Sequence, residues 1–263
     1  VGIAEQNMAS VAAGMRGYGF IPFITSFTPF ASRRICDQIA ISIAYAKQNV
    51  KIIGSDPGIS AEFNGGTHMS MEDIGVLRSI PELVIYEPVD VAQFKQALPQ
   101  IVAYEGPVYI RMFRKTIDDV FTDANYKFDL FGADCIQEGT AVTIFCSGIM
   151  VQETMKANEI LKQEGIDAEI INIHTIKPID RDAVVASAKK TGAVVVAENH
   201  NVIGGLTSAV CEVLMEEYPV PLRAVGVKDR FGQVGKMPFL KEEYHMTAKD
   251  IVSAVKEVIR LNK

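Results

Sequence analysis

Hydrophobic positions along the chain follow two spacings in turn. Short runs rich in β-branched residues, typical of buried strands, are separated by segments in which apolar residues recur every three or four positions, as on one face of a helix. This alternation predicts mainly parallel sheets covered by helices on both faces. In the first half we predict strands at 20–27, 51–54, 83–86 and 108–113, and helices at 3–16, 32–47, 71–79 and 91–103.

The second half restarts the same alternation after a break. Residues 116–138 are rich in Asp and turn residues, and the alternation from Tyr126 to Phe131 suggests an edge hairpin. We therefore predict an α/β protein with two doubly wound domains, 1–117 and 139–263, joined by a linker at 118–138. The predicted strands of the second domain are 141–146, 168–173, 193–197 and 222–226, and its helices are 150–164, 178–190, about 206–217 and 248–262.

Composition narrows the class of protein. The chain has 263 residues, 48% of them hydrophobic, and a net charge of −6 without any basic run, which disfavours nucleic-acid binding. No apolar stretch is long enough to span a membrane. The four cysteines and four histidines are scattered, which favours reduced thiols in a cytoplasmic protein over a disulfide framework or a metal motif. The chain begins at Val1 and enters a helix directly, so we expect that a preceding strand is missing.

The polar, glycine-rich stretch 55–70 follows a predicted buried strand. Loops at the carboxyl ends of such strands are where open α/β sheets bind ligands. His68 lies near the end of this stretch, and the spacing of Ser70 and Asp73 is typical of a helix start. From the residues alone, His68 is either a ligand-facing side chain or a surface residue beside that helix.

Other candidates are ambiguous when read singly. Glu5 lies in a first helical turn, where acids are common because of the helix dipole. Phe27 and Phe30 fit an ordinary core. Glu198-Asn199-His200 at a strand end, followed by Gly204-Gly205 before a helix, offers a weak case for an anion site. We interpret two further histidines as structural, His174 and His245.

Several motifs in order resemble one enzyme family. GIAEQNM (2–8), GGTH (65–68), LRSIP (77–81) and VYIRMFRK (108–115) look like the pyrimidine-binding domain of transketolases and of 1-deoxyxylulose-5-phosphate synthases. TIKPID (175–180), the stretch 198–206 and DRFGQVG (229–235) are similar to the C-terminal domain of the same superfamily. The resemblance implies the C-terminal subunit of a two-subunit transketolase, a transferase that moves a two-carbon ketol unit between sugar phosphates.

The resemblance also implies roles for individual residues. Glu5 would contact N1′ of the pyrimidine ring of thiamine diphosphate and act in catalysis, and Phe27 and Phe30 would flank that ring, with Phe30 as the stacking partner. His68 would face the substrate hydroxyls and act in catalysis. The remaining expectations are substrate binding by Asn64 and Arg114, a pocket position for Arg33, a surface position for Arg34 and a sheet-edge salt bridge for Arg111.

The expected cofactor site and partner follow from the resemblance, because a whole transketolase also has a diphosphate-binding domain whose motif is absent from this sequence. The diphosphate and its Mg²⁺ (or Ca²⁺) ion would be bound mainly by an N-terminal transketolase subunit, so we expect a heterodimer pair that self-associates to a dimer or heterotetramer. The sequence departs from the family's EDGPTH run, having Phe63, Asn64 and Gly66 at three of its positions. These changes put the usual sugar phosphate in doubt and leave room for a modified or branched sugar.

Three alternatives stay open. The chain could be a fragment of a 1-deoxyxylulose-5-phosphate synthase, the beta subunit of a 2-oxoacid dehydrogenase, or a non-catalytic assembly subunit. The altered loop at 63–66 permits the last of these.

Overall fold

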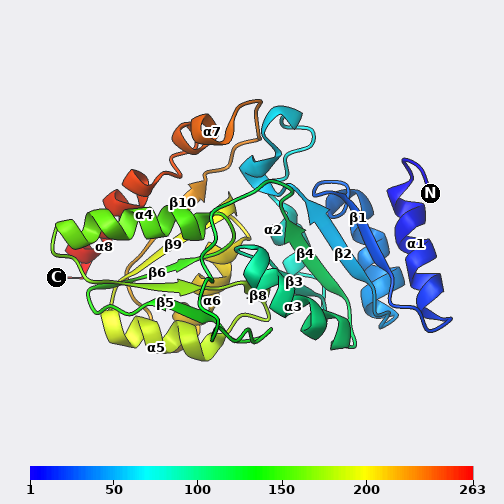
Figure 1. Ribbon diagram of the computed structural model, residues 1–263, viewed down its shortest axis with the longest axis horizontal. Coiled ribbons are helices and arrows are strands. Elements are labelled where there is room, and N and C mark those ends of the chain that lie inside the picture. The colour runs from blue at the N-terminus through cyan, green and yellow to red at the C-terminus, as the bar shows by residue number, and fades with distance from the viewer. Residues whose placement is uncertain (263) are drawn as a thin grey trace.

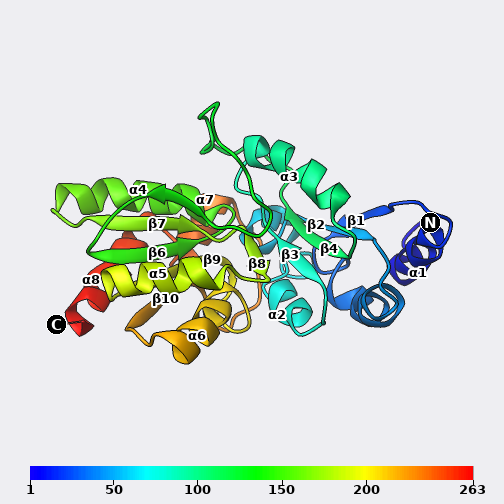
Figure 2. The same cartoon turned by 90° about the horizontal axis from the view of Figure 1, so that it is seen from below.

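Two five-stranded sheets lie side by side along the long axis of the computed structural model, which describes residues 1–262 (Figure 1). The N-terminal helix lies at one end of the molecule and the C-terminal helix at the other, as both views show (Figure 2). The predicted fold class, two α/β domains with mainly parallel sheets, is confirmed. No helix within residues 1–262 combines the length and apolarity needed to cross a bilayer.

The first sheet has the strand order β1-β2-β4-β3-β8, which places β4 in its middle. Its first four strands are parallel, and the fifth is antiparallel and comes from the second half of the chain. The sequence prediction missed this fifth strand, whose residues lie between a predicted strand and a predicted helix and pair with the other half of the chain. The strands are β1 (Phe23–Phe27), β2 (Lys51–Ser55), β3 (Val84–Tyr86), β4 (Val108–Met112) and β8 (Thr175–Lys177).

The second sheet has the order β10-β9-β6-β7-β5. It is parallel except for β5, an antiparallel edge strand that lies inside the stretch we expected to be a linker. The strands are β5 (Asp134–Gln137), β6 (Val142–Cys146), β7 (Ala168–Asn172), β9 (Val194–Asn201) and β10 (Leu222–Val227).

Helices cover both sheets. In the second half, α4 and α8 pack on each other and on one face of the sheet, and α5 and α6 pack on the other (Figures 1 and 2). The short α7 was not predicted. The helices are α1 (Glu5–Arg16), α2 (Asp73–Arg78), α3 (Val91–Ala103), α4 (Met150–Gln163), α5 (Arg181–Thr191), α6 (Leu206–Glu217), α7 (Met237–Glu243) and α8 (Ala248–Leu261).

The predicted helix 32–47 is not an α-helix. It consists of a 3₁₀ turn, η1 (Arg33–Ile35), and a π-helix, η2 (Gln38–Tyr45). Its apolar stripe was predicted correctly, since Ile35, Ile39 and Ile43 are all fully buried. A π-helix has more residues per turn than an α-helix, so residues four apart stay closer to one line facing the core.

Two other local predictions were wrong. The first strand begins at Phe23 and not at residue 20, because Pro22 has no N–H to donate to a ladder. The alternating stretch Tyr126–Phe131 forms no hairpin. Instead, Gln96 and Gln100 of α3 bond its backbone: each amide donates to one carbonyl (Tyr126 and Phe128, 2.9 and 2.7 Å) and accepts from one N–H (Phe128 and Leu130, 3.1 and 2.9 Å).

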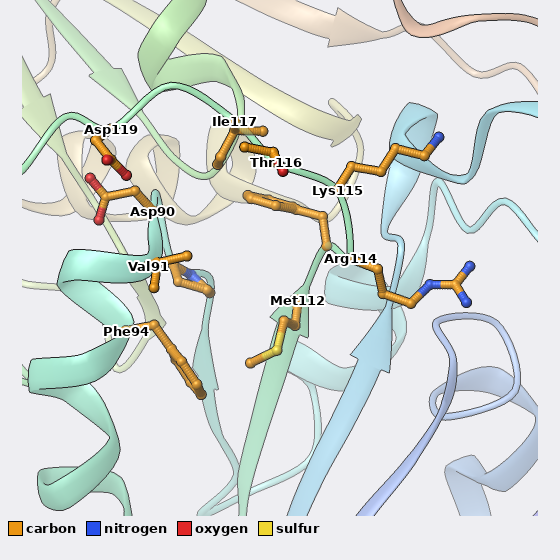
Figure 3. A pocket seen from close by; sticks show the side chains of 11 residues that line it. Asp90, Val91, Phe94, Met112, Arg114, Lys115, Thr116, Ile117 and Asp119 are labelled. Carbon is orange, nitrogen blue, oxygen red and sulfur yellow. The ribbon is translucent and has the colours of Figure 1, made fainter.

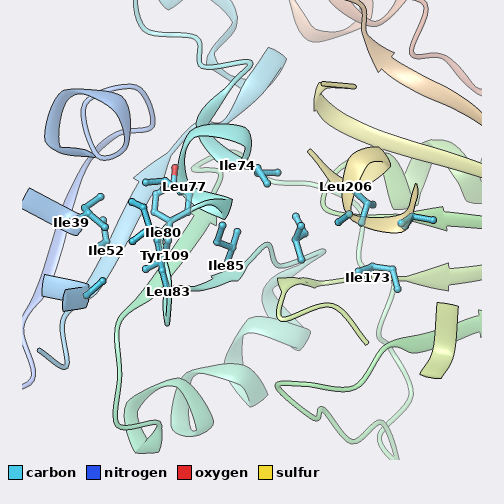
Figure 4. Packing of buried hydrophobic residues seen from close by; sticks show 14 of the residues in the cluster. Ile39, Ile52, Ile74, Leu77, Ile80, Leu83, Ile85, Tyr109, Ile173 and Leu206 are labelled. Carbon is cyan, nitrogen blue, oxygen red and sulfur yellow. The ribbon is translucent and has the colours of Figure 1, made fainter. Parts of the chain in front are cut away.

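The largest apolar cluster runs through both halves of the molecule. Ile39 and Ile52 lie at one side of it and Ile173 and Leu206 at the other, as Figure 4 shows, and all four are at most 1% exposed. Burial of this kind contributes about 25 cal/mol per Å² of apolar surface, so the two halves stabilise each other. This shared core spans both sheets.

Candidate functional site

Three parallel strands of the first sheet end at one edge. The chain leaves β1 at Phe27, β2 at Ser55 and β4 at Met112, and backbone hydrogen bonds tie these ends together: Thr28 N–H donates to Ser55 O (2.9 Å) and Asp56 N–H to Met112 O (2.8 Å). This is the carboxyl edge, where the sequence predicted ligand binding. The stretch 55–70 is more regular than expected, because 3₁₀ turns within Gly58–Asn64 (η3), interrupted by a kink at Glu62, occupy its centre.

Three rings form an aromatic wall at this edge. His68 packs edge-on against Phe27 and Phe30, with ring centroids 5.2 and 5.0 Å away, and the two phenylalanine rings are 6.3 Å apart at 87°. All three side chains are half-buried. The structure therefore brings together a histidine and two phenylalanines that are up to 41 positions apart in the sequence.

Glu5 joins this wall through Arg34. The carboxylate of Glu5, at the start of α1, accepts a hydrogen bond from the Arg34 guanidinium at 3.0 Å. That guanidinium lies over the Phe30 ring, 3.8 Å from its centroid. Burial acts to raise the pKa of Glu5, but its own backbone N–H, Arg34 and Ser26 outweigh burial, so the pKa lies below its ordinary value. Glu5 is thus an ionised acceptor at the edge of an aromatic surface.

Arg114 closes the other end of the wall. Its guanidinium lies 4.8 Å from the Phe27 ring centroid, and its Nε donates to Asp56 at 2.6 Å. In Figure 3 the Arg114 side chain points away from the hollow between α3 and β4 that Phe94 and Met112 line. We did not predict Asp56 as a site residue. It lies in the turn after β2, 58 positions before Arg114 in the sequence, and only the fold brings the two side chains together.

The other basic residues near this edge are also paired. Arg33 forms an ion pair with Glu72, and Lys115 forms one with Glu62. Arg33, which we expected in the pocket, therefore bonds to an acid other than Glu5. Arg34, which we expected at the surface, holds Glu5 and covers Phe30.

Asn64 is not part of the contact chain. It is exposed at the end of η3. The loop after Asn64 passes close to the second half of the chain. A side chain at Gly66 would prevent this approach, since its Cβ would lie 2.4 Å from the Gly232 carbonyl oxygen. The position of Asn64 as a substrate ligand stays a prediction.

The N-terminus of α6, a weak candidate for an anion site, is capped by a carboxylate of the chain itself. The Glu198 carboxylate caps the start of α6, accepting from the backbone N–H groups of Leu206 (2.6 Å) and Thr207 (3.0 Å). Burial raises the pKa of Glu198 to about 7 against these hydrogen bonds. Because the chain's own carboxylate satisfies the helix N-terminus, this segment has a structural role.

Arg111 was placed wrongly by sequence reasoning. It belongs to the central strand β4, not to a sheet edge, and is fully buried. Its guanidinium donates to Asp73 (2.7 and 3.1 Å), to Glu87 (2.5 Å) and to the carbonyl oxygen of Asn199 (3.0 Å). Asp73 therefore pairs with Arg111 and does not build the capping pair with Ser70 that its spacing suggested.

Comparisons with known proteins agree on one family. The model of the transketolase pyrimidine-binding domain matches residues 1–118, and that of the transketolase C-terminal domain matches residues 132–251. The chain is 57% identical over 258 residues to the 6-deoxy-6-sulfo-D-fructose transketolase subunit SqwH of Clostridium sp. (strain MSTE9), covering 98% of this chain and 80% of that protein.

Two further comparisons distinguish between the alternatives. A solved structure titled split gene transketolase, inactive beta4 tetramer, superposes with a TM-score of 0.91 at 42% identity, covering 100% of this chain and 84% of that one. The 1-deoxy-D-xylulose-5-phosphate synthase of Heliobacterium modesticaldum is 32% identical, and the match covers 98% of this chain but 40% of that enzyme. Both family models, the 57% identical subunit and the structural match place the chain in the transketolase family, as a transferase subunit that carries the pyrimidine-binding and C-terminal domains.

Proposed function

We propose that this subunit supplies the pyrimidine half of a thiamine diphosphate site and transfers a two-carbon ketol unit between anionic sugars, together with a partner subunit. The observation that carries the proposal is the unbroken series of contacts Glu5–Arg34–Phe30–His68–Phe27–Arg114 at one sheet edge. It joins an acid, an aromatic wall, an imidazole and a guanidinium, which are the groups that this chemistry requires.

The residues fit the aminopyrimidine. A flat aromatic ring stacks on a half-buried phenylalanine, and a ring nitrogen that shares a proton needs a carboxylate beside it. Phe30 offers the first, and Glu5, with its side chain 10% exposed, offers the second. Thiamine diphosphate, when bound, supplies the electron sink that lets a carbon–carbon bond break and form. Glu5 would hold the proton shared with N1′, while Phe27 and Phe30 would hold the ring in place.

The diphosphate and its Mg²⁺ or Ca²⁺ ion are assigned to the partner. Within residues 1–262, one group of three metal-capable side chains lies close together, Cys135, Glu138 and Glu169, and it is on the second sheet, where Lys190 already pairs with both glutamates. A hard, oxygen-preferring cation would gain little there. The working unit would be a pair of unlike subunits, and the tetramer named for the structural relative supports further self-association.

The substrate we propose is a ketose with an anionic end group. Arg114 suits such a group because its planar guanidinium donates parallel hydrogen bonds. His68, on the same wall, would donate to a sugar hydroxyl, with Asn64 as a further ligand. The 57% identical relative is named for a sulfonated fructose, which favours a sulfonate over a phosphate at that end.

The decisive experiment compares Glu5→Ala with Glu159→Ala, an exposed position on α4, in the reconstituted two-subunit enzyme. Loss of a general acid/base typically costs about 10²–10⁴-fold in rate, so Glu5→Ala should lose at least about 100-fold in kcat and the control nothing. Assays with 6-deoxy-6-sulfofructose and fructose 6-phosphate decide the end group. Near-normal turnover of Glu5→Ala would contradict the proposal and favour a non-catalytic assembly subunit.

A further inference from the structure

We propose that Arg34 occupies the pyrimidine half-site of the unassembled subunit and is displaced when the cofactor binds, so that it sets the affinity of the enzyme for its cofactor. This inference rests on the proposed function, in which Glu5 and Phe30 hold the aminopyrimidine. It adds a role for a residue that the sequence placed at the surface.

The geometry of Arg34 resembles that of the group it would exclude. A guanidinium is a flat, delocalised cation that stacks on aromatic faces and donates to carboxylates. Arg34 does both at once, lying 3.8 Å from the Phe30 centroid and donating to Glu5 at 3.0 Å. An aminopyrimidine is also flat and needs the same two partners.

The Arg34 guanidinium and the aminopyrimidine would compete, because Arg34 contacts both Phe30 and Glu5. Since its guanidinium touches both Phe30 and Glu5, it covers the part of the ring that lies nearest the carboxylate. His68 is a second neighbour of the same ring, in a T-shaped arrangement. Beside Glu5 is a hollow of about 420 Å³ lined by residues 3–7 and by Arg34. Space for a ligand is therefore present next to Glu5, and Arg34 forms its wall.

Arg34 is held weakly enough to move. Its own side chain is 42% exposed although that of Glu5 is 10% exposed, and ion pairs open to solvent on one side typically contribute about 1 kcal/mol. The neighbouring Arg33 has similar exposure, 43%, but pairs with Glu72. Arg33 is thus a matched control for general changes in charge at this edge.

The first test measures cofactor affinity by calorimetry. The chain is mixed with its partner subunit, Mg²⁺ and thiamine diphosphate, using wild type, Arg34→Met and Arg33→Met. Methionine keeps an apolar stem and removes the guanidinium. Because one ion pair and one cation–π contact are lost from the competing state, Arg34→Met should bind about three- to tenfold more tightly. Arg33→Met should bind as wild type does. Equal or weaker binding by Arg34→Met overturns the inference.

The second test needs neither cofactor nor partner. A ¹³C NMR titration follows the Glu5 carboxyl, which faces its own backbone N–H, Arg34 and Ser26. Arg34→Met should raise the pKa of Glu5, and an unchanged pKa would mean that the Arg34–Glu5 pair does not form, which also overturns the inference. Failure of the proposed function has a different signature: wild type and Glu5→Ala would then bind thiamine diphosphate equally, or neither would bind.

Discussion

Burial and hydrogen bonding act in opposite directions on single ionisable side chains of this protein. At Glu5, near the surface, hydrogen bonds outweigh burial and lower the pKa. At His174, fully buried against the rings of Tyr86 and Phe128, burial prevails and lowers the pKa to about 4, and the ring Nε2 has no hydrogen-bond partner in the described residues. Both shifts make stability fall as the pH falls, because in each case the unfolded chain binds the proton more tightly than the folded chain.

His174 gives a pH-dependent prediction. Its folded pKa of about 4 lies below the ordinary value of 6.5, so the unfolded chain binds the proton first as the pH falls. Its contribution to stability is therefore present above pH 6.5 and is lost progressively down to pH 4. In His174→Phe the free energy of unfolding should fall less steeply with decreasing pH than in wild type, by up to about 1.4 kcal/mol per pH unit.

Urea unfolding at several pH values between 7 and 4 measures this slope. His245→Gln, at an exposed position, is the control variant. Parallel curves for wild type and His174→Phe would show that His174 takes up no proton on unfolding.

At the scale of elements, side chains of a helix make the hydrogen bonds that a neighbouring strand would make in a sheet. Gln96 and Gln100 on α3 present an acceptor and a donor each, one helical turn apart, to the extended chain at Tyr126–Leu130. The segment thus has the alternation of a strand and satisfied backbone groups without a β partner.

This arrangement predicts where the backbone loosens first. Gln96→Ala with Gln100→Ala should speed amide hydrogen exchange at Phe128 and Leu130, whose N–H groups lose their acceptors, and should cost about 1 kcal/mol per lost hydrogen bond. Lys95→Ala, exposed on the same helix, is the control. Unchanged exchange at both amides would show that other contacts hold this segment.

At the scale of the molecule, buried charge and apolar packing both cross between the halves. Arg111 joins α2 through Asp73, the end of β3 through Glu87, and β9 through the Asn199 carbonyl, and none of these side chains is exposed. Ser147, at the end of β6, donates to Glu87 at 2.7 Å and adds the second sheet to the network. The network and the shared core together fix the relative position of the two sheets.

Removal of Arg111 should therefore affect the whole molecule. Arg111→Met leaves Asp73 and Glu87 buried with no cation, which typically costs about 3–5 kcal/mol of the free energy of unfolding. Arg223→Met removes an exposed ion pair with Glu257 and should cost less than about 1 kcal/mol. Thermal unfolding followed by calorimetry measures both, and equal melting temperatures would contradict the role given to Arg111.

Features that depend on near neighbours along the chain or on motifs could be predicted from the sequence. Periodicity located most strands and helices, and the order of motifs identified the family and selected five residues that the structure brings together, Glu5, Phe27, Phe30, His68 and Arg114. Periodicity works for these elements because a buried face repeats with the geometry of its own helix or strand.

Contacts between residues far apart in the sequence became known only from the fold. The pairing of β8 with β3, the burial of Arg111 in a central strand and the contact of Arg34 with Glu5, 29 positions apart, have no signal in local spacing. A charged residue in a sequence carries no mark of its partner, because electrostatic and packing energies depend on distance in space and not along the chain. For the same reason, the predicted pocket position of Arg33 and surface position of Arg34 did not reveal their partners, which the fold shows to be Glu72 and Glu5.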